Sequence, residues 1–352
     1  MNTLIIRADA SSEIGAGHLM RCLALGQAWN DAGGKVVFIT ACAAEGLLKR
    51  LCKEGFDVCR LERSYPDDYD QKYTKSVLAT YPGAWVVLDG YHFDEIYQQH
   101  VKESGHKLLV IDDMAHLKHY YADIVLNQNL HAGKLQYSCE AFTQLLLGTK
   151  YVLLRREFIA WKDWKREIPE VAQRVLVTLG GGDPDNHTLK AIQALQKGDV
   201  SGLEATVIIG ATNRHKDKLE TEVTRSSIPI RLVRNAENMS KLMAWGDVAV
   251  SAAGTTVWEL MFMALPSLFL IVAENQFFAA RALNHFGTVV IARSWDQMLF
   301  VYYLRKLLIS MKLREHISAL SRTVIDGFGA FRVADTIRHI PQSHSVMPKG
   351  SE

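Results

Sequence analysis

"IIRADASSEIGAGHLMRCLALG", residues 5–26, joins a short apolar run to a longer stretch with helical periodicity. The run at its start is typical of a buried strand, and apolar residues from His18 onward recur at the spacing of an amphipathic helix. Between the two, Gly15 and Gly17 permit positive φ angles and the close approach of another group. A strand that leads through a glycine loop into a helix predicts the first unit of a parallel α/β sheet.

The same alternation continues along both halves of the chain. Apolar runs without polar alternation suit parallel strands that are buried on both faces. We expect strands at 4–6, 36–39, 85–88, 108–111, 175–179, 206–209, 228–233, 248–251 and 268–272. Helical periodicity separates those of the first half, at 18–30, 45–54, 67–80 and 94–103. Strands that alternate with helices predict doubly wound α/β sheets.

The length of 352 residues exceeds one ordinary core, so we expect two domains. "REFIAWKDWKREIPE", residues 156–170, is typical of a linker, because it is charged and carries two tryptophans that should pack onto a domain. The remaining chain then forms Rossmann-like domains at 1–155 and 171–340 and a polar tail at 341–352. Ligands of such sheets bind beyond the carboxyl ends of the strands, which predicts a cleft between the domains.

The composition argues against several classes of protein. Hydrophobic residues make up 48%, charged residues 22%, and the net charge of +2 comes without a lysine or arginine block. Five cysteines without a CxxC pair indicate free thiols in a reducing compartment. No leader pattern opens the sequence, and no apolar run approaches the ~20 residues of a membrane span. We therefore expect a cytoplasmic protein with neither nucleic-acid nor membrane partners. A monomer is the simplest expectation, although the sequence leaves the oligomeric state open.

His18 falls in the first turn of the helix that follows the opening loop. Unpaired N–H groups and the positive end of the helix dipole favour an anion there. The same field disfavours a protonated imidazole, so His18 should be neutral and able to act as a general base. The alternative is a plain glycine turn with a surface histidine. The third glycine of GxGxxG is absent, which argues against a dinucleotide.

"LVTLGGGDPDNHT", residues 176–188, places three glycines directly after an expected strand. Three glycines exceed what a turn needs, and they indicate that a ligand phosphate touches bare backbone; a merely flexible loop is the alternative. Pro184 suits the first position of a helix, with Asp183 as its N-cap. His187 then lies in the first turn, where a solvated side chain is the simplest interpretation.

"SAAGTTVWEL", residues 251–260, repeats the strand, loop and helix order. Glu259 lies among apolar neighbours near the start of that helix, where a carboxylate suits the dipole and can accept two hydrogen bonds from a ribose diol. A capping box with Thr256 is the alternative interpretation of this spacing. Asn275 and Gln276 follow the next strand and are placed to hydrogen-bond a ligand.

Acidic residues end two strands of the first half. Asp89 and Tyr91 follow one, and Asp112 and Asp113 follow another. Paired carboxylates are compatible with a metal, yet an aspartate after a buried strand commonly braces a loop, and zinc spacing is absent. We expect neither a metal nor a cofactor. The GxSxG, P-loop and HExxH motifs are also absent, which argues against a serine hydrolase, a P-loop enzyme and a zincin.

Together these motifs resemble the UDP-2,4-diacetamido-2,4,6-trideoxy-β-L-altropyranose hydrolase family of pseudaminic acid biosynthesis. The similar pieces keep their order from about residue 5 to residue 335: the opening stretch, "VVLDGY", "VIDDMAHLKHYYADIVLNQN", "LLGTKYVLLRREF", "TLGGGDPDN", "SAAGTTVWEL", "ENQ" and "GFGAFRVAD". More distantly, the second half resembles the UDP-binding half of MurG-type glycosyltransferases. The resemblance implies a GT-B architecture, with UDP held mainly by the second domain.

The resemblance also implies roles for particular residues. The catalytic histidine falls on His18, and an active-site tyrosine falls on Tyr91. The motifs and the resemblance together assign the UDP-sugar to Gly15, Gly17, Gly181, Gly182, Asn186, Thr255, Glu259, Asn275 and Gln276. One departure is visible, because the family's loop before the ribose carboxylate often reads Gly-Gly-Ser. Here Ala253 stands at its first position and restricts the backbone.

The implied reaction is hydrolysis of a UDP-linked sugar with inversion. His18 would take a proton from a water at the anomeric carbon as UDP leaves. Ordinary glycosidases need an acid for their leaving group, whereas a nucleoside diphosphate departs as a stable anion. Two alternatives stay open at this point: an inverting GT-B glycosyltransferase that uses a UDP-sugar donor, and a non-catalytic nucleotide-sugar binding protein.

Overall fold

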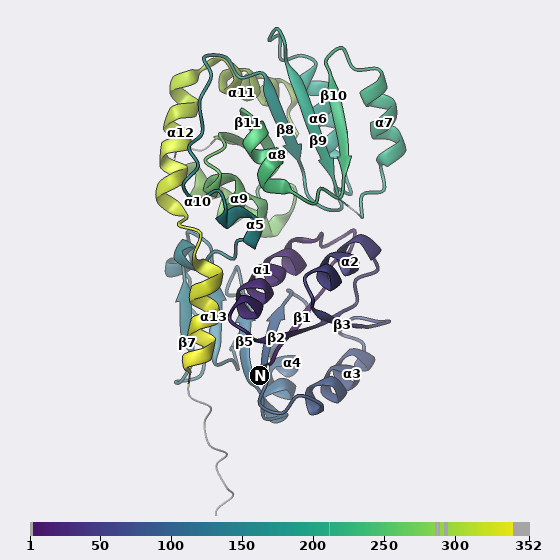
Figure 1. Cartoon of the computed structure of the whole chain (residues 1–352), viewed down its shortest axis with the longest axis vertical. Coiled ribbons are helices and arrows are strands. Elements are labelled where there is room, and N and C mark those ends of the chain that lie inside the picture. Colours follow the sequence, from purple (N-terminus) through teal and green to yellow (C-terminus); the bar gives the residue numbers. More distant parts are fainter. Residues whose placement is uncertain (1–2, 211, 286, 288, 292–294, 341–352) are drawn as a thin grey trace, which may run out of the picture.

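The computed structural model describes residues 3–210, 212–285, 287, 289–291 and 295–340, which form two α/β domains stacked along the long axis of the molecule (Figure 1). Each domain is built on one parallel sheet with helices on both faces. The predicted fold class, two Rossmann-like doubly wound domains of the GT-B type, is confirmed. The expected tail at 341–352 lies outside the described residues.

In the described part of the chain the first sheet has the order β3-β2-β1-β4-β5-β6-β7, and the second has the order β10-β9-β8-β11-β12-β13. The strands of the first are β1 Thr3–Ala8, β2 Lys35–Thr40, β3 Asp57–Arg60, β4 Trp85–Asp89, β5 Lys107–Ile111, β6 Ile124–Asn127 and β7 Gln144–Leu147. Those of the second are β8 Arg174–Thr178, β9 Glu204–Ile209, β10 Ile230–Arg234, β11 Val248–Ala252, β12 Ser267–Leu270 and β13 Val289–Ile291. The order reverses beside β1 and β8, and such switch points open a crevice for ligands.

Helices connect these strands and cover both faces of each sheet. Those before the second sheet are α1 Gly17–Asp31, α2 Glu45–Lys53, α3 Asp68–Ala79, α4 Glu95–Glu103 and α5 Arg156–Ile159. Those that follow are α6 His187–Leu195, α7 Lys216–Thr224, α8 Met239–Trp245, α9 Thr256–Phe262, α10 Phe277–His285, α11 Gln297–Ile309, α12 Met311–Val324 and α13 Gly329–His339. None of the helices in the described ranges is long and apolar enough to cross a membrane.

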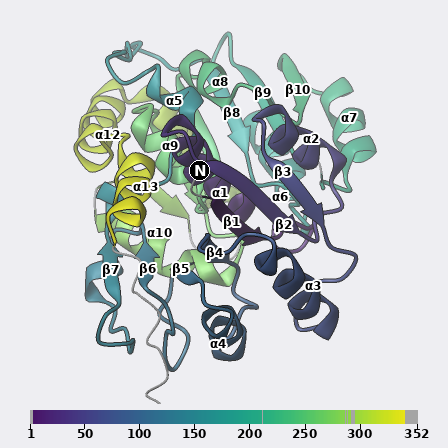
Figure 2. The same cartoon turned by 60° about the horizontal axis from the view of Figure 1, so that its bottom comes forward.

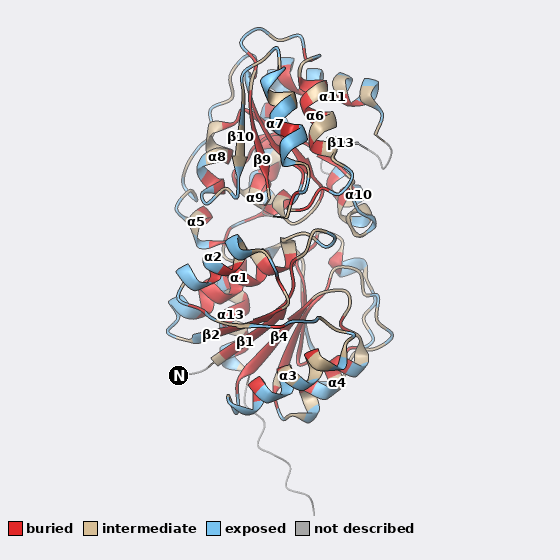
Figure 3. Ribbon diagram, turned by 90° about the vertical axis from the view of Figure 1, so that its right-hand side faces the viewer, coloured by how far each residue is buried: buried red, intermediate tan, exposed pale blue. Residues whose placement is uncertain are grey.

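Burial on both faces explains why the strands lack a polar alternation. In β1, Leu4 and Ile6 pack into the core shared with α1, α2 and α13, while Ile5 points to the opposite core with α3 and α4. In β8, Val175 and Leu176 divide in the same way between two cores of the second domain. Figure 3 shows the buried strands between the half-exposed helices. Every predicted strand is present, with its ends shifted by no more than two residues.

Four strands escaped the sequence prediction: β3, β6, β7 and β13. Each has only three or four residues, which is too short for periodicity to identify. Three of them also lie at sheet edges. The edge position leaves the residues of β3 half-buried or exposed, so its composition is as polar as that of a loop.

The linker and the last helix tie the two domains together. Trp161 and Trp164 pack against the core of the second domain with their ring centroids 5.3 Å apart, as the sequence predicts. The helix α13 returns to the first domain, where Val333 and Ile337 are buried in the core beside α1 (Figures 1 and 2). The expected range 171–340 for the second domain is therefore wrong at its end, because an amphipathic helix gives no local sign of which sheet it covers.

Candidate active site

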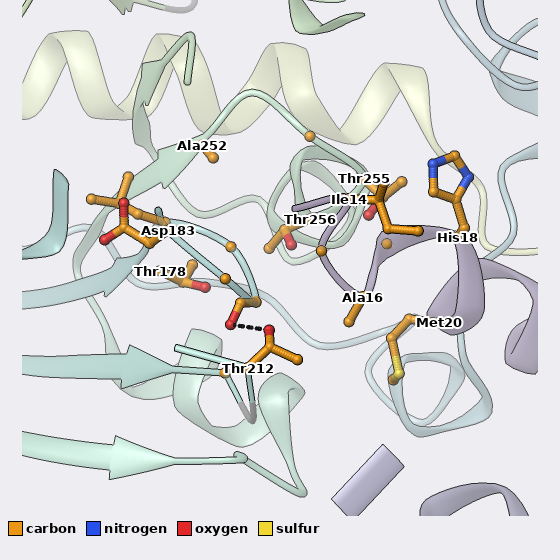
Figure 4. A pocket seen from close by; sticks show the side chains of 18 of the residues that line it. Ile14, Ala16, His18, Met20, Thr178, Asp183, Thr212, Ala252, Thr255 and Thr256 are labelled. Atoms are coloured by element: carbon orange, nitrogen blue, oxygen red, sulfur yellow. Dashed lines mark hydrogen bonds between the residues drawn. The ribbon is translucent and has the colours of Figure 1, made fainter. Parts of the chain in front are cut away.

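A cleft of about 710 Å³ lies between the domains, at the carboxyl ends of both sheets. Figure 4 shows His18 at the start of α1 on one side, and Thr178, Thr212 and Asp183 on the other. The predicted site residues that line the cleft are Gly15, Gly17, His18, Tyr91, Gly181, Gly182, Thr255, Glu259, Asn275 and Gln276. Asn186 does not line it.

His18 is buried, and its Nδ1 lies 2.7 Å from Oδ1 of Asp89 at the end of β4. A carboxylate only accepts hydrogen bonds, so Nδ1 carries the proton of the neutral ring. The lone pair is then on Nε2. Although burial opposes the charge of Asp89, the Arg21 guanidinium and the His18 ring hold the pKa of its carboxyl well below the usual value. The arrangement therefore gives His18 a fixed tautomer that can accept a proton.

Arg21 joins the two acidic strand ends of the first domain. Its Nε and one terminal nitrogen donate to Asp89, both at 2.7 Å, and its other terminal nitrogen donates to both oxygens of Asp113 at 3.0 and 2.9 Å. Arg21 is not among the predicted site residues, although it lies three residues after His18 on one face of α1. Bidentate pairs of this kind fix both carboxylates in place.

Tyr91 joins the same network beside the His18 ring. The two rings meet edge to face, with centroids 4.9 Å apart. Its hydroxyl donates to Asp113 at 2.6 Å and accepts from Nδ2 of Asn275 at 3.2 Å. Burial and the Asp113 carboxylate raise the pKa of Tyr91 far above its usual value, so the hydroxyl stays protonated. The bond from Asn275 thus carries the network across to the second domain.

Asp112 has a structural role beside this network. Its Oδ2 accepts from the backbone of Met114 and Ala115 at 3.0 and 2.7 Å, and the hydroxyls of Tyr120 and Tyr137 also donate to its carboxylate. These bonds brace a turn in which Ala115 has φ of 53°. Among the described residues, no group of three or more His, Cys, Asp or Glu is arranged to hold a metal ion.

The glycine loop of the second domain lies directly against the opening loop of the first. A Cβ added to Gly182 would collide with the carbonyl oxygen of Ser12, and one on Gly181 would lie 3.2 Å from the backbone nitrogen of Ala16. Thr212 donates to the carbonyl of Gly181 at 2.8 Å (Figure 4). The close approach of two backbones from different domains therefore explains why glycine is needed at these positions, apart from any contact with a ligand.

The start of α6 differs from the sequence prediction. Pro184 is not the first helical residue, since α6 begins at His187 with Asn186 as its N-cap at φ of 52°. Asn186 uses its side chain to accept from the backbone of Leu189, which explains its absence from the cleft. The prediction of Asp183 as the N-cap is therefore wrong, although its carboxylate, from a left-handed turn, accepts from the backbone of His187 and of the next residue, both at 2.8 Å.

His187 lines the cleft, contrary to the solvated side chain that we expected. It is half-buried, and burial lowers the pKa of its imidazole. Its Nδ1 has no hydrogen-bond partner among the described residues. A neutral, partly buried ring suits a contact with a ligand better than a place in solvent.

Glu259 is held by Arg155, a residue that the sequence analysis missed. Nε and one terminal nitrogen of Arg155 donate to Oε1 of Glu259 at 3.0 and 2.8 Å. The capping-box alternative is wrong, because α9 begins at Thr256 and its N-cap Thr255 makes no side-chain cap bond. Burial raises the pKa of the Glu259 carboxyl, while the Arg155 charge opposes that rise.

The start of α1 is open to an anion. Its N-cap, Ala16, has no side chain that could bond the first N–H groups, and the first turn has no acidic residue. These groups lie at the cleft beside His18. Unpaired N–H groups and the helix dipole can stabilise negative charge there.

Residues 175–291 match the Glycosyltransferase family 28 C-terminal domain. A UDP-2,4-diacetamido-2,4,6-trideoxy-beta-L-altropyranose hydrolase of Campylobacter jejuni is 25% identical over 78% of this chain and 93% of its own length. A Pseudaminic acid cytidylyltransferase and UDP-2,4-diacetamido-2,4,6-trideoxy-beta-L-altropyranose hydrolase of Helicobacter pylori is 28% identical over 58% of this chain and 37% of its length. An uncharacterized protein of Methanocaldococcus jannaschii is 27% identical over 78% of this chain. The chain spans only 56% of that relative's length.

Solved structures resemble the whole chain at low sequence identity. Acinetobacter baumannii MurG has a TM-score of 0.63 at 12% identity and covers 97% of this chain and 100% of its own. Staphylococcus aureus MnaA, solved with UDP, has a TM-score of 0.69 at 11% identity and covers 96% of both chains. Anabaena HepE, solved with UDP-glucose, has a TM-score of 0.63 at 11% identity, and the match covers 97% of this chain and 100% of its own. These likenesses show the GT-B fold.

Proposed function

We propose that the chain hydrolyses a UDP-linked sugar at its anomeric carbon and releases the free sugar and UDP. The observation that carries this proposal is the His18–Asp89 pair at the cleft, with the imidazole Nε2 left to accept a proton. The distant similarity to hydrolases of Campylobacter jejuni and Helicobacter pylori supports a UDP-linked 2,4-diacetamido-2,4,6-trideoxy sugar as the substrate.

In the proposed reaction, Nε2 of His18 takes a proton from a water beside the anomeric carbon. The water oxygen bonds to that carbon while the bond from the carbon to the phosphate oxygen breaks, so the configuration inverts. The Asp89 carboxylate stabilises the imidazolium that forms. UDP leaves as an anion, which needs no acid, and the N–H groups at the start of α1 can stabilise its growing charge. Tyr91 contacts the His18 ring and bonds Asn275, so it links the base to the second domain.

The second domain would hold UDP. We assign Glu259 to the ribose, as an acceptor of its hydrogen bonds, and Gly181, Gly182 and Thr255 to the diphosphate, and all four residues line the cleft. Gln276 lines the cleft with its Oε1 bonded to the backbone of Val272 at 3.0 Å. The match to the Glycosyltransferase family 28 C-terminal domain supports this division between the domains.

The same domain match favours one other function, an inverting glycosyltransferase that passes the sugar to an acceptor. Incubation with the UDP-linked diacetamido sugar and no acceptor separates the two. Free sugar and UDP formed in equal amounts, at a rate comparable to other enzymes of about 1–10³ s⁻¹, would support hydrolysis. Turnover that appears only when an acceptor is added would contradict the hydrolase.

A further inference from the structure

The carboxylate of Glu259 is used on only one of its two oxygens. Oε1 receives both bonds from Arg155, and no described residue bonds Oε2. The side chain is 14% exposed and lines the cleft. A buried carboxylate with one fixed oxygen and one oxygen left over is oriented before any ligand arrives.

Arg155 is itself fixed from several sides. It is 4% exposed, and its guanidinium lies over the Phe158 ring at 5.2 Å from the centroid. Its second terminal nitrogen lies 3.1 Å from Oε1 of Glu157, whose other oxygen pairs with Arg50 of α2 at 2.6 Å. Arg50 also donates to the backbone carbonyl of Glu237 in the second domain at 3.0 Å. Residues of the linker, of α2 and of the second domain thus share one chain of ion pairs.

We propose that Arg155 is a positioning residue for the nucleotide, which keeps Glu259 charged and turned so that Oε2 accepts from the ribose diol of UDP. This inference rests on the proposed function, in which Glu259 binds the ribose. Arg155 acts through Glu259 and does not touch the nucleotide. A charged acceptor bonds a hydroxyl about twice as strongly as a neutral one, and a protonated carboxyl loses part of its accepting capacity.

The surroundings of Glu259 make its charge depend on Arg155. Burial raises the pKa of its carboxyl and the Glu157 carboxylate adds to that rise, while Arg155 and, more weakly, Arg50 lower it. Without Arg155, the burial and the Glu157 charge remain. Loss of Arg155 moves the pKa of Glu259 further upward, so the carboxyl of the variant binds a proton at a higher pH than that of the wild type.

The variants are tested by calorimetric binding of UDP, uridine and 2′-deoxy-UDP between pH 6 and 8. Glu259→Gln should weaken UDP about 10- to 100-fold, the effect of losing a charged hydrogen-bond acceptor. Arg155→Gln should weaken UDP and uridine by similar factors of about 10, with a larger loss at pH 6 than at pH 8. The UDP affinity of the wild type should not change across this pH range. The affinity for 2′-deoxy-UDP should fall little in either variant. The double variant should bind no worse than Glu259→Gln alone.

Two controls keep the test specific. Arg156→Gln removes the neighbouring linker arginine, which pairs with Asp31 at 2.6 Å and with Glu54 at 3.4 Å but not with Glu259. This variant should leave all affinities unchanged. Arg155→Lys keeps the charge and should restore most of the flat pH profile. Circular dichroism and thermal unfolding check that each variant is folded. If Arg155→Gln does not fold, the affinities of Arg155→Lys for UDP and uridine are compared instead, and a loss for UDP alone would contradict the positioning role.

Each outcome has a distinct meaning. If Arg155→Gln weakens UDP but not uridine, Arg155 contacts the diphosphate and the positioning role is wrong. If Glu259→Gln weakens UDP while Arg155→Gln does not, the positioning role is wrong and the nucleotide site stands. If Glu259→Gln leaves UDP unchanged, the ribose contact in the proposed function is wrong as well.

Discussion

His18 and Asp89 lie 71 positions apart in the sequence and 2.7 Å apart in the fold. Asp89→Asn keeps the size of the side chain but replaces the carboxylate that fixes the imidazole tautomer. We expect kcat to fall by about 10²- to 10⁴-fold, the range of general-base catalysis. The affinity for UDP should stay within about twofold, because Asp89 lies in the first domain. Initial rates of UDP release and calorimetry measure the two quantities, and an unchanged kcat would contradict the role of the pair.

At this scale the sequence predicts residues that belong to local motifs. His18 and Glu259 follow strands and open helices, so their place at the cleft follows from chain order alone. Arg155 could not be found in that way, because it meets Glu259 across 104 positions. Arg21 carried a weak signal, since it shares a helix face with His18. Only the fold shows which carboxylates these arginines meet.

At the scale of elements, the opening loop and the glycine loop fit together because neither has side chains in the way. Gly182→Ala would place a methyl group against the carbonyl of Ser12. We expect the two loops to separate and kcat to fall by about 10- to 100-fold, the cost of a misplacement of about 1 Å. UDP affinity should change less than kcat.

Gly133→Ala is the matched control for Gly182→Ala. It is an exposed residue of the 3-10 turn Ala132–Lys134, and an added Cβ there meets no atom within 4 Å. Its kinetics should equal those of the wild type. A Gly182→Ala variant that loses UDP affinity with kcat intact would mean that Gly182 acts through the diphosphate alone, and would contradict the role of the loop contact in turnover.

The elements themselves were predictable where they are long and amphipathic. The four expected helices of the first half, and every expected strand, are present because their periodicity reflects burial on one or both faces. Asn186 shows the limit of this approach. A polar residue after a glycine loop can bind a ligand or cap a helix. Because α6 begins at His187, Asn186 caps the helix.

At the scale of the whole molecule, the last described helix, α13, packs against the core of the first domain. Ile337 is 1% exposed in the core beside α1. Ile337→Ala should lower the free energy of unfolding by about 2–5 kcal/mol, as other buried Ile-to-Ala changes do. Phe331→Ala, on the same helix but 39% exposed, should change it by about 0.5 kcal/mol or less. Urea unfolding measures both, and equal effects would contradict the packing of α13 on the first domain.

The central claim is that water activated by His18 attacks the sugar carbon and not the phosphorus of UDP. Turnover of the UDP-linked diacetamido sugar in ¹⁸O-labelled water, followed by mass spectrometry and NMR, tests it directly. We predict one labelled oxygen at the anomeric carbon of the free sugar, with inverted configuration and no label in UDP. Label in the terminal phosphate of UDP would contradict the account.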